Sequence, residues 1–121
     1  MKLIDRLIII GILLNIIVYT VIFGNNFIVS SSKGDSMCPA LHSKAIGLEK
    51  IIDLDDEFII GNIYTFKGED YGFVNEYIKH RLINITDDGF LFRGDSNDYA
   101  DLIKREDIVY KHLFEIPYGW C

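Results

Sequence analysis

The stretch FVNEYIKHRLINITDDGFLFR, residues 73–93, contains the pattern that decides the fold. It holds two runs rich in Ile, Tyr and Phe, which are separated by Asp-Asp-Gly at 87–89. Residues of these types favour strands, and an Asp-Gly step between two apolar runs is typical of a β-hairpin turn. We therefore predict two antiparallel strands, Phe73–Ile85 and Phe90–Arg93, joined at this turn.

Similar short runs flank this hairpin and are bounded by Gly-Asn, Lys-Gly and Gly-Asp steps, which are turn signals. The sequence shows no amphipathic helix of ordinary length, and only Asp53–Glu57 is expected to form a helical turn. An all-β domain is therefore expected. Its other predicted strands are Ala45–Lys50, Ile59–Ile60, Asn62–Lys67 and Asp107–Phe114.

The N-terminal part of the chain has a different composition. Leu7–Phe23 carries no charged residue, and a membrane-spanning helix needs roughly 20 apolar residues, with a lower limit near 17. Lys2 and Arg6 precede this run, which favours a cytoplasmic N-terminus and places the remainder on the extracytoplasmic side. A cleaved signal peptide is the alternative, although its apolar core would span only about 7–15 residues. We expect residues 1–26 to be an uncleaved anchor in the lipid bilayer and residues 27–121 to be the β-domain.

Charge and cysteine content exclude several classes of function. The 121-residue chain has a net charge of −6, whereas nucleic-acid binding requires a basic surface, so nucleic acid is excluded as a partner. Cys38 and Cys121 have no metal-ligand spacing, and their pairing stays open. The acidic stretch Gly94–Asp101 lacks the sixth-position glycine of a calcium-binding EF-hand loop. We predict neither a metal nor a cofactor.

Ser36 lies in GDSMCPAL, residues 34–41, shortly after the apolar run. The segment fails the G-x-S-x-G pattern of a nucleophile elbow because Cys38 replaces the second glycine. A serine hydroxyl becomes a nucleophile only with a base within hydrogen-bond reach. The available histidines are His42, His80 and His112. By residue type alone, the segment favours a turn hydroxyl for Ser36.

His80 lies in the strand-like run KHRLI. Strand alternation places Lys79 and His80 on opposite faces, so only one of them can face a given partner. Asp95, Asp98 and Asp101 follow the strand predicted to pair with the His80 strand. A carboxylate beside an imidazole can orient it and stabilise its charged form, although a lone strand histidine is more often structural.

These segments together resemble type I signal peptidases, specifically the archaeal and eukaryotic endoplasmic-reticulum branch. GDSMCPAL is similar to the serine box, KHRLI to the second box in its His-Arg form, and RGDSNDYAD to the third box. Asp95 and Asp101 have the spacing of that third box. IIGNIYTFK and the closing IPYGW also resemble stretches of the family. The resemblance covers nearly the whole chain after the anchor.

The resemblance implies a signal-peptidase-like β-domain and a membrane-bound serine endopeptidase, a hydrolase without cofactor that removes signal peptides from secreted or membrane precursors after small residues. Ser36 would attack the scissile carbonyl, and His80 would accept its proton. Asp101 would orient or charge-stabilise His80, with Asp95 as a supporting carboxylate. The backbone N–H of Ser36 would form part of the oxyanion hole.

Two departures from the family pattern matter. Gly34 stands where some members have a serine that supplies a second oxyanion donor, so that donor is unassigned. The sequence ends at Cys121 without a second span, which suggests a minimal enzyme assisted by accessory subunits or translocation machinery. An extended substrate would pair with a strand edge, either Phe27–Ser32 or Tyr64–Phe66.

Two rival functions remain open at the level of sequence. A repressor-type self-cleaving protease would use a Ser-Lys pair, for which Lys79 is the nearest candidate. A catalytically inactive, membrane-anchored β-domain would bind exported peptides without cleaving them.

Overall fold

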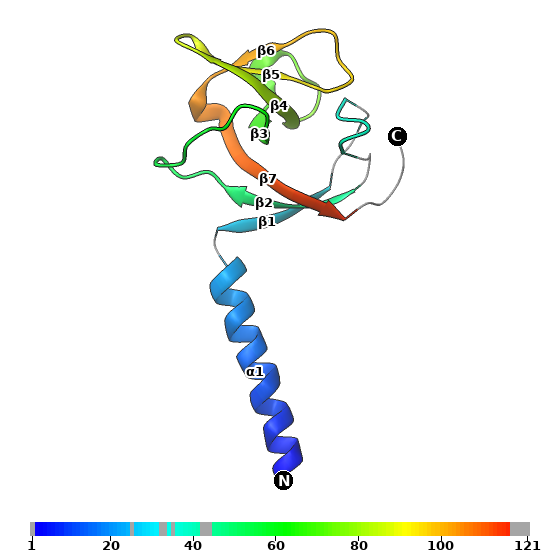
Figure 1. Ribbon diagram of the computed structural model, residues 1–121, viewed down its shortest axis with the longest axis vertical. Coiled ribbons are helices and arrows are strands. Elements are labelled where there is room, and N and C mark those ends of the chain that lie inside the picture. The colour runs from blue at the N-terminus through cyan, green and yellow to red at the C-terminus, as the bar shows by residue number, and fades with distance from the viewer. Residues whose placement is uncertain (1, 25, 32–33, 35, 42–44, 117–121) are drawn as a thin grey trace.

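The computed structural model of the protein describes residues 2–24, 26–31, 34, 36–41 and 45–116. One α-helix, α1 (Leu3–Phe23), precedes the strands, and two short 3₁₀ helices, η1 (Glu69–Tyr71) and η2 (Arg105–Asp107), lie between them (Figure 1). The strands are β1 (Phe27–Ser31), β2 (Ile46–Ile51), β3 (Ile63–Lys67), β4 (Tyr77–Thr86), β5 (Gly89–Arg93), β6 (Asp101–Ile103) and β7 (Ile108–Ile116).

The strands form one seven-stranded sheet in the order β1-β2-β7-β3-β4-β5-β6. Each neighbouring pair is antiparallel. The long strand β7 joins the part of the sheet nearest α1 to the part that contains β3–β6 (Figure 1). The prediction of a mostly β chain with one N-terminal apolar helix is therefore confirmed.

The hairpin predicted at residues 87–89 joins β4 to β5. Thr86 pairs with Gly89, so Asp87 and Asp88 form a two-residue loop. Gly89 has φ +151°, and a Cβ at this position would lie 2.8 Å from the carbonyl oxygen of Ile103 on β6. Only glycine adopts this backbone conformation and approach without strain.

Several sequence-based boundaries were wrong. Ile59 and Ile60 lie in irregular backbone, because they are about half exposed and precede Gly61, whose φ is +99°. The first part of Phe73–Ile85 is a loop, since β4 begins at Tyr77. The short strand β6 was not predicted, because three residues beginning with an aspartate have no strand pattern of their own and depend on pairing with β5.

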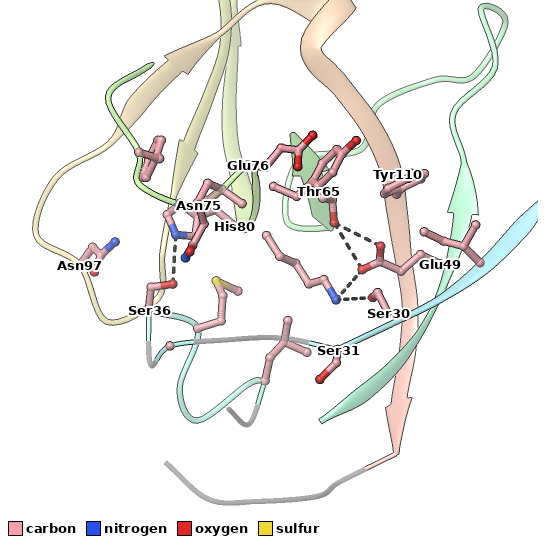
Figure 2. Close-up of a pocket in the computed structure, with 18 of the residues that line it drawn as sticks. Ser30, Ser31, Ser36, Glu49, Thr65, Asn75, Glu76, His80, Asn97 and Tyr110 are labelled. Carbon is pink, nitrogen blue, oxygen red and sulfur yellow. Dashed lines mark hydrogen bonds and ion pairs between the residues drawn. The ribbon is translucent and has the colours of Figure 1, made fainter. Parts of the chain in front are cut away.

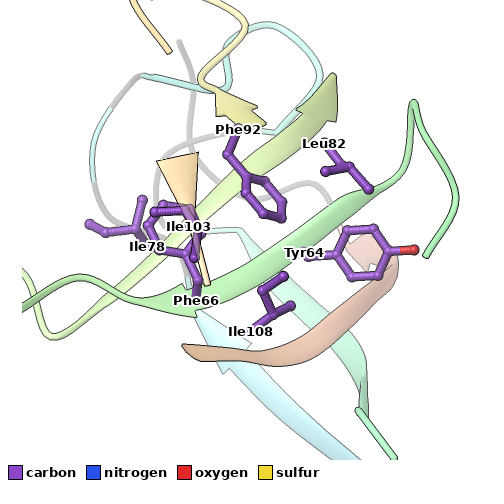
Figure 3. Close-up of a cluster of buried hydrophobic side chains, with 7 residues drawn as sticks. All are labelled: Tyr64, Phe66, Ile78, Leu82, Phe92, Ile103 and Ile108. Atoms are coloured by element: carbon purple, nitrogen blue, oxygen red, sulfur yellow. The ribbon is translucent and has the colours of Figure 1, made fainter. Parts of the chain in front are cut away.

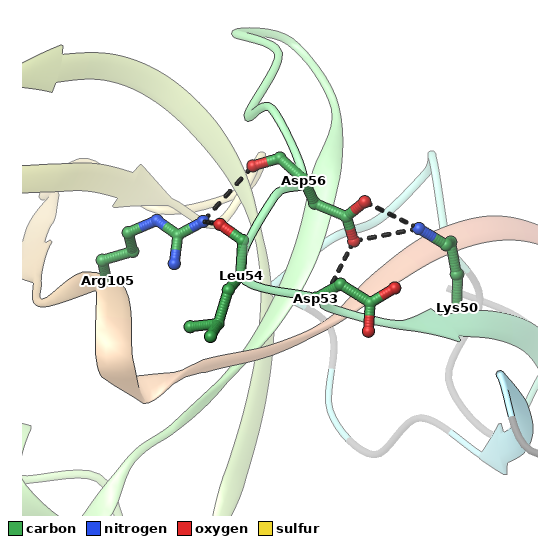
Figure 4. A network of polar contacts seen from close by, with 5 residues as sticks. All are labelled: Lys50, Asp53, Leu54, Asp56 and Arg105. Carbon is green, nitrogen blue, oxygen red and sulfur yellow. Dashed lines mark hydrogen bonds and ion pairs between the residues drawn. The ribbon is translucent and has the colours of Figure 1, made fainter.

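The expected helical turn at Asp53–Glu57 is instead a loop with a tight turn at residues 54–55. Lys50 Nζ binds Asp56 Oδ1 at 2.8 Å, and Arg105 donates to the Leu54 carbonyl oxygen at 2.8 Å (Figure 4). These contacts with β2 and η2 hold the backbone in a shape that local helix propensity does not specify.

The core lies between the strands and combines aromatic with aliphatic side chains (Figure 3). Its buried members are Tyr64, Phe66, Ile78, Leu82, Phe92, Ile103 and Ile108. On β4, residues 78, 80 and 82 are buried and alternate with more exposed positions. This alternation directs His80 inward between hydrophobic neighbours, with the rings of Phe66 and Phe73 centred 5.9 and 6.0 Å from its own.

The β3 strand has its first four residues buried and pairs with both β4 and β7. The prediction that Tyr64–Phe66 could offer a free strand edge is therefore wrong, because both edges of this segment are already hydrogen-bonded. By contrast, among the described strands β1 pairs with β2 alone and ends the sheet.

Within the described residues, α1 is the one helix that is long and apolar enough to cross a membrane. Its 21 residues correspond to about 30 Å, the thickness of a hydrocarbon core. Asn15 and Thr20 donate side-chain hydrogen bonds to the carbonyl oxygens of Gly11 and Ile16. These bonds satisfy polar groups that would otherwise oppose insertion into lipid.

Candidate functional site

Ser36 begins a compact turn, residues 36–41, that is anchored by its neighbours. The backbone N–H of Leu41 donates to the Met37 carbonyl oxygen at 2.9 Å. Met37 and Leu41 are buried and pack with Ile63 of β3. Two apolar side chains therefore fix the turn on the sheet and leave the half-buried Ser36 beside the pocket.

A second turn, which follows β5, holds the Ser36 turn in place. The Ser96 backbone N–H donates to the Ser36 carbonyl oxygen at 2.8 Å, and Ser96 Oγ donates to the Cys38 carbonyl oxygen at 2.8 Å. Gly94 permits this approach, because a Cβ there would lie 2.8 Å from the Ser36 carbonyl oxygen and 2.9 Å from Ser36 Cβ. This close packing places the third sequence box directly against the serine.

Ser36 and His80 are brought together across the pocket. His80 Nε2 lies 3.1 Å from Ser36 Oγ (Figure 2). His80 is 3% exposed. Burial lowers the pKa of the His80 imidazole below its ordinary value, and the charges of Asp101 and Asp95 oppose this shift only in part. A neutral imidazole is the form that can accept a serine proton.

The two predicted carboxylates lie in different surroundings. Asp95 receives two hydrogen bonds from Arg81, at 2.9 Å from Nε and 2.8 Å from Nη2. These bonds with Arg81 lower the pKa of Asp95 below its ordinary value, although burial opposes them. Asp101 lies at the start of β6, and its Oδ2 is buried without a hydrogen-bond partner in the described part of the chain.

The second imidazole nitrogen of His80 is in the same situation as Asp101 Oδ2. His80 Nδ1 is buried and has no hydrogen-bond partner among the described residues. Neither Asp95 nor Asp101 forms a hydrogen bond with it there, but both charges are near enough to raise the pKa of the imidazole. The structure therefore brings the four predicted side chains into one region and joins Ser36 to His80 directly.

Lys79 reaches a separate polar cluster at the other side of the same pocket. Its Nζ lies 2.5 Å from Glu49 Oε1 and donates to Ser30 Oγ at 3.1 Å (Figure 2). Thr65 Oγ1 donates to Glu49 at 3.2 Å, and His112 Nδ1 lies 3.8 Å from Glu49 Oε1. Glu49 is fully buried. Burial raises its pKa, but His112 and Lys79 outweigh this effect, so the pKa of Glu49 is lower than usual.

Sequence reasoning missed Glu49 and His112 as members of this cluster. Glu49 occupies one of the inward positions of β2, where an alternating strand normally carries an apolar residue. A charged residue at a position that alternation marks as buried was the available signal. The identity of its partners depends on the order of β2, β7 and β3 in the sheet.

One pocket of about 620 Å³ connects the two polar groups. Ser36, His80 and Asn97 lie toward one end, while Ser30 and Glu49 lie toward the other (Figure 2). Lys79 contacts both Ser30 and Glu49. Met37, Leu41 and Ile78 add apolar surface between them. The pocket thus combines a nucleophile–base pair with apolar walls, a combination typical of a substrate-binding site.

Metal ligation and cysteine pairing are two further features that the sequence raised. Among the described residues, no group of three His, Cys, Asp or Glu side chains could hold a metal ion. Cys38 is disulfide-bonded. The chain's other cysteine, Cys121, and the candidate base His42 lie outside the described residues.

No protein-family model matches the chain, and neither a curated protein nor a solved structure is significantly similar to it. The fold and site define a mostly β chain with one N-terminal helix that could cross a membrane, and with a hydrogen-bonded Ser–His pair in a pocket.

Proposed function

We propose that the protein is a membrane-anchored serine endopeptidase, a signal peptidase in which Ser36 is the nucleophile and His80 is the general base. The observation that carries this proposal is the 3.1 Å contact between Ser36 Oγ and His80 Nε2 beside a substrate-sized pocket. A serine with a buried, neutral imidazole within hydrogen-bond reach is the arrangement that activates a hydroxyl.

The chemistry follows from this pair. Ser36 Oγ forms a bond to the scissile carbonyl carbon while its proton passes to His80 Nε2, and the carbonyl oxygen becomes an oxyanion. The C–N bond then breaks, and His80 returns the proton to the leaving amine. Water, activated by the same imidazole, hydrolyses the ester and regenerates Ser36. Asp101 and Asp95 favour the imidazolium formed in between, because their negative charges raise the pKa of His80.

The resemblance of the three sequence boxes supports signal peptides as the substrate class. The sheet geometry is compatible with an extended substrate, since β1 ends the sheet and Ile28, Ser30 and Ser31 of this strand line the pocket. An extended peptide can add to such a strand through backbone hydrogen bonds. Cleavage after small residues remains part of this proposal.

Membrane location follows from the same reasoning. The apolar α1 would tether the site close to the bilayer, where the apolar part of a precursor ends, and tethering raises the effective concentration of both partners. Lys2 and Arg6 before the apolar run favour a cytoplasmic N-terminus. The disulfide at Cys38 supports an extracytoplasmic catalytic domain, because disulfides persist in oxidising compartments.

The rival Ser-Lys mechanism receives less support from the geometry. The hydrogen bond and ion pair described above direct the Lys79 ammonium to Ser30 and Glu49, whereas Ser36 Oγ contacts His80. Both side chains line the same pocket, so their different partners, and not opposite faces of β4, account for this division.

The test is cleavage of a secretory precursor by purified, detergent-solubilised protein. We expect Ser36→Ala and His80→Ala to abolish product formation, whereas Ser30→Ala and Lys79→Met should retain measurable turnover. A serine-reactive acyl probe should label Ser36 in the wild type. Full turnover by Ser36→Ala would reject the peptidase, and absence of both labelling and turnover in the wild type would favour the inactive peptide-binding domain.

A further inference from the structure

We propose that the side-chain amide of Asn97 donates the second hydrogen bond of the oxyanion hole, beside the backbone N–H of Ser36. The inference rests on the proposed peptidase function and assigns a residue to a role that Gly34 leaves vacant.

The need for this donor follows from the chemistry. When Ser36 attacks, the carbonyl oxygen gains a full negative charge, and serine hydrolases stabilise that charge with donors held in place beforehand. The Ser36 N–H supplies one donor and has no acceptor among the described residues. Gly34 has no side chain, and a Cβ built there would have nothing within 4 Å. Among the described residues, a side-chain donor therefore has to come from another segment.

The turn after β5 is the segment that reaches the serine. Its backbone is fixed by the Ser96 contact with Ser36 and by a 2.9 Å hydrogen bond from the Asn97 N–H to the Gly94 carbonyl oxygen. A Cβ at Gly94 would lie 2.7 Å from Asn97 Nδ2 and 2.9 Å from Ser36 Cβ. Asn97 Nδ2 and Ser36 Cβ are therefore close neighbours, separated by the space that glycine leaves open.

The orientation and chemistry of Asn97 suit this role. Its side chain is half-buried and lines the pocket, and Figure 2 shows its nitrogen directed toward the Ser36–His80 pair. Within the described part of the chain, the Asn97 side-chain amide has no hydrogen-bond partner. A neutral amide donates two hydrogens at every pH of interest and does not compete with His80 for the serine proton.

In the proposed step, the Ser36 Oγ–carbon bond forms, the carbonyl π electrons move to oxygen, and the proton passes to His80. Asn97 Nδ2–H then donates to the oxyanion without transferring its proton. The same hydrogen bond weakens when the C–N bond breaks and the acyl carbonyl is restored. The interaction is therefore stronger in the transition state than with the bound substrate, which is the condition for raising kcat.

The test compares Asn97→Asp and Asn97→Ala with Asn84→Asp, a substitution of an exposed residue on β4 that does not line the pocket. Asp retains the shape of Asn but replaces the donor with an acceptor. We expect both Asn97 variants to lower kcat by about 10²–10³-fold with KM nearly unchanged. A peptide aldehyde, which forms a tetrahedral adduct with Ser36, should bind more weakly by a similar factor, while Asn84→Asp stays within about threefold of the wild type for both quantities.

The outcomes separate the two proposals. Wild-type cleavage that is lost in Ser36→Ala but stays within threefold in Asn97→Ala would overturn the role of Asn97 and leave the peptidase intact. A reduced kcat with unchanged aldehyde affinity would also overturn it. If both Asn97 variants lose their cooperative thermal unfolding, the residue is structural and the inference is wrong. Absence of wild-type cleavage would remove the proposed function and this inference together.

Discussion

The protonation state of the His80 imidazole determines the pH range in which the site contains a neutral base. Burial between Phe66 and Phe73 lowers the pKa of the imidazole, and the charges of Asp101 and Asp95 counteract this only in part. His80 is therefore neutral at neutral pH and becomes protonated only below the usual histidine range, near 6.5. A reaction that needs a neutral base should keep its rate down to that range and lose it at lower pH.

The Asp101→Asn variant tests how the carboxylate acts on His80. Asp101 raises the pKa of the imidazole, so its neutralisation should lower that pKa and move the acid limb of the kcat/KM profile to lower pH. The maximal rate should also fall, because the charge that stabilises the imidazolium is lost. The measurement is a pH–rate profile for precursor cleavage from about pH 4.5 to 8.

The matched control is Asp98→Asn, an exposed carboxylate in the same stretch that does not contribute to the pKa shift of His80. Its profile should overlay that of the wild type. An acid limb that moves upward in Asp101→Asn, or moves equally in both variants, would contradict an electrostatic role for Asp101.

At the scale of the strands, a buried ionic cluster connects elements that lie far apart in the sequence. Glu49 on β2 receives contacts from Lys79 on β4, Thr65 on β3 and His112 on β7, and Lys79 also binds Ser30 on β1. A buried charge is tolerated only when partners surround it. The cluster therefore makes the stability of this part of the sheet depend on each partner.

The Lys79→Met variant should lose about 3–5 kcal/mol of unfolding free energy, because it leaves the Glu49 carboxylate buried without its main cation. Adding Glu49→Leu should recover part of this loss, since the double variant has no buried charge to compensate. The control is Lys50→Met, which removes the partly exposed ion pair with Asp56 and should cost at most about 1 kcal/mol.

Denaturant unfolding of the detergent-solubilised chain measures all three variants. A Lys79→Met variant as stable as Lys50→Met would show that the Glu49–Lys79 pair contributes little. A double variant that is less stable than Lys79→Met would contradict the explanation by an uncompensated buried charge.

At the scale of the whole molecule, α1 and the β-domain differ in the solvent that they require. The α1 side chains at positions 7–20 are exposed to their surroundings, uncharged and mostly apolar, so water is an unfavourable environment for this helix. The β-domain instead buries its own core. In a membrane, such a helix would place the β-domain a few residues from the lipid surface, since β1 begins soon after α1 ends.

Membrane attachment is tested by Leu13→Lys in the middle of α1. A lysine at a helix centre raises the free energy of insertion by about 2.5–3.5 kcal/mol, so the variant should move from the membrane pellet toward the alkaline-extractable fraction. Leu54→Lys is the control, because Leu54 is 90% exposed in a loop of the β-domain. Equal extraction of the wild type and both variants would show that α1 is not a membrane anchor.

The sequence by itself determined the features that arise from neighbouring residues. Strand alternation and the Asp-Asp-Gly turn predicted the β4–β5 hairpin, because both act within a few positions. The uncharged apolar run likewise predicted α1, since helix length and lipid solubility depend on local composition. The contact between Ser36 and His80 was expected from the order of the sequence boxes, not from a local pattern.

Only the tertiary structure decided which distant groups meet. The Ser36–His80 contact spans 44 positions in the chain, the Lys79–Ser30 contact spans 49, and Ser96 binds the Ser36 carbonyl oxygen from the turn after β5. Strand pairing also explains why neither edge of β3 is free and why β6 forms beside β5. The fold likewise brings Asp95 within hydrogen-bond distance of Arg81. These results depend on which strands pair and how closely two turns approach, and short-range propensities contain no information about either.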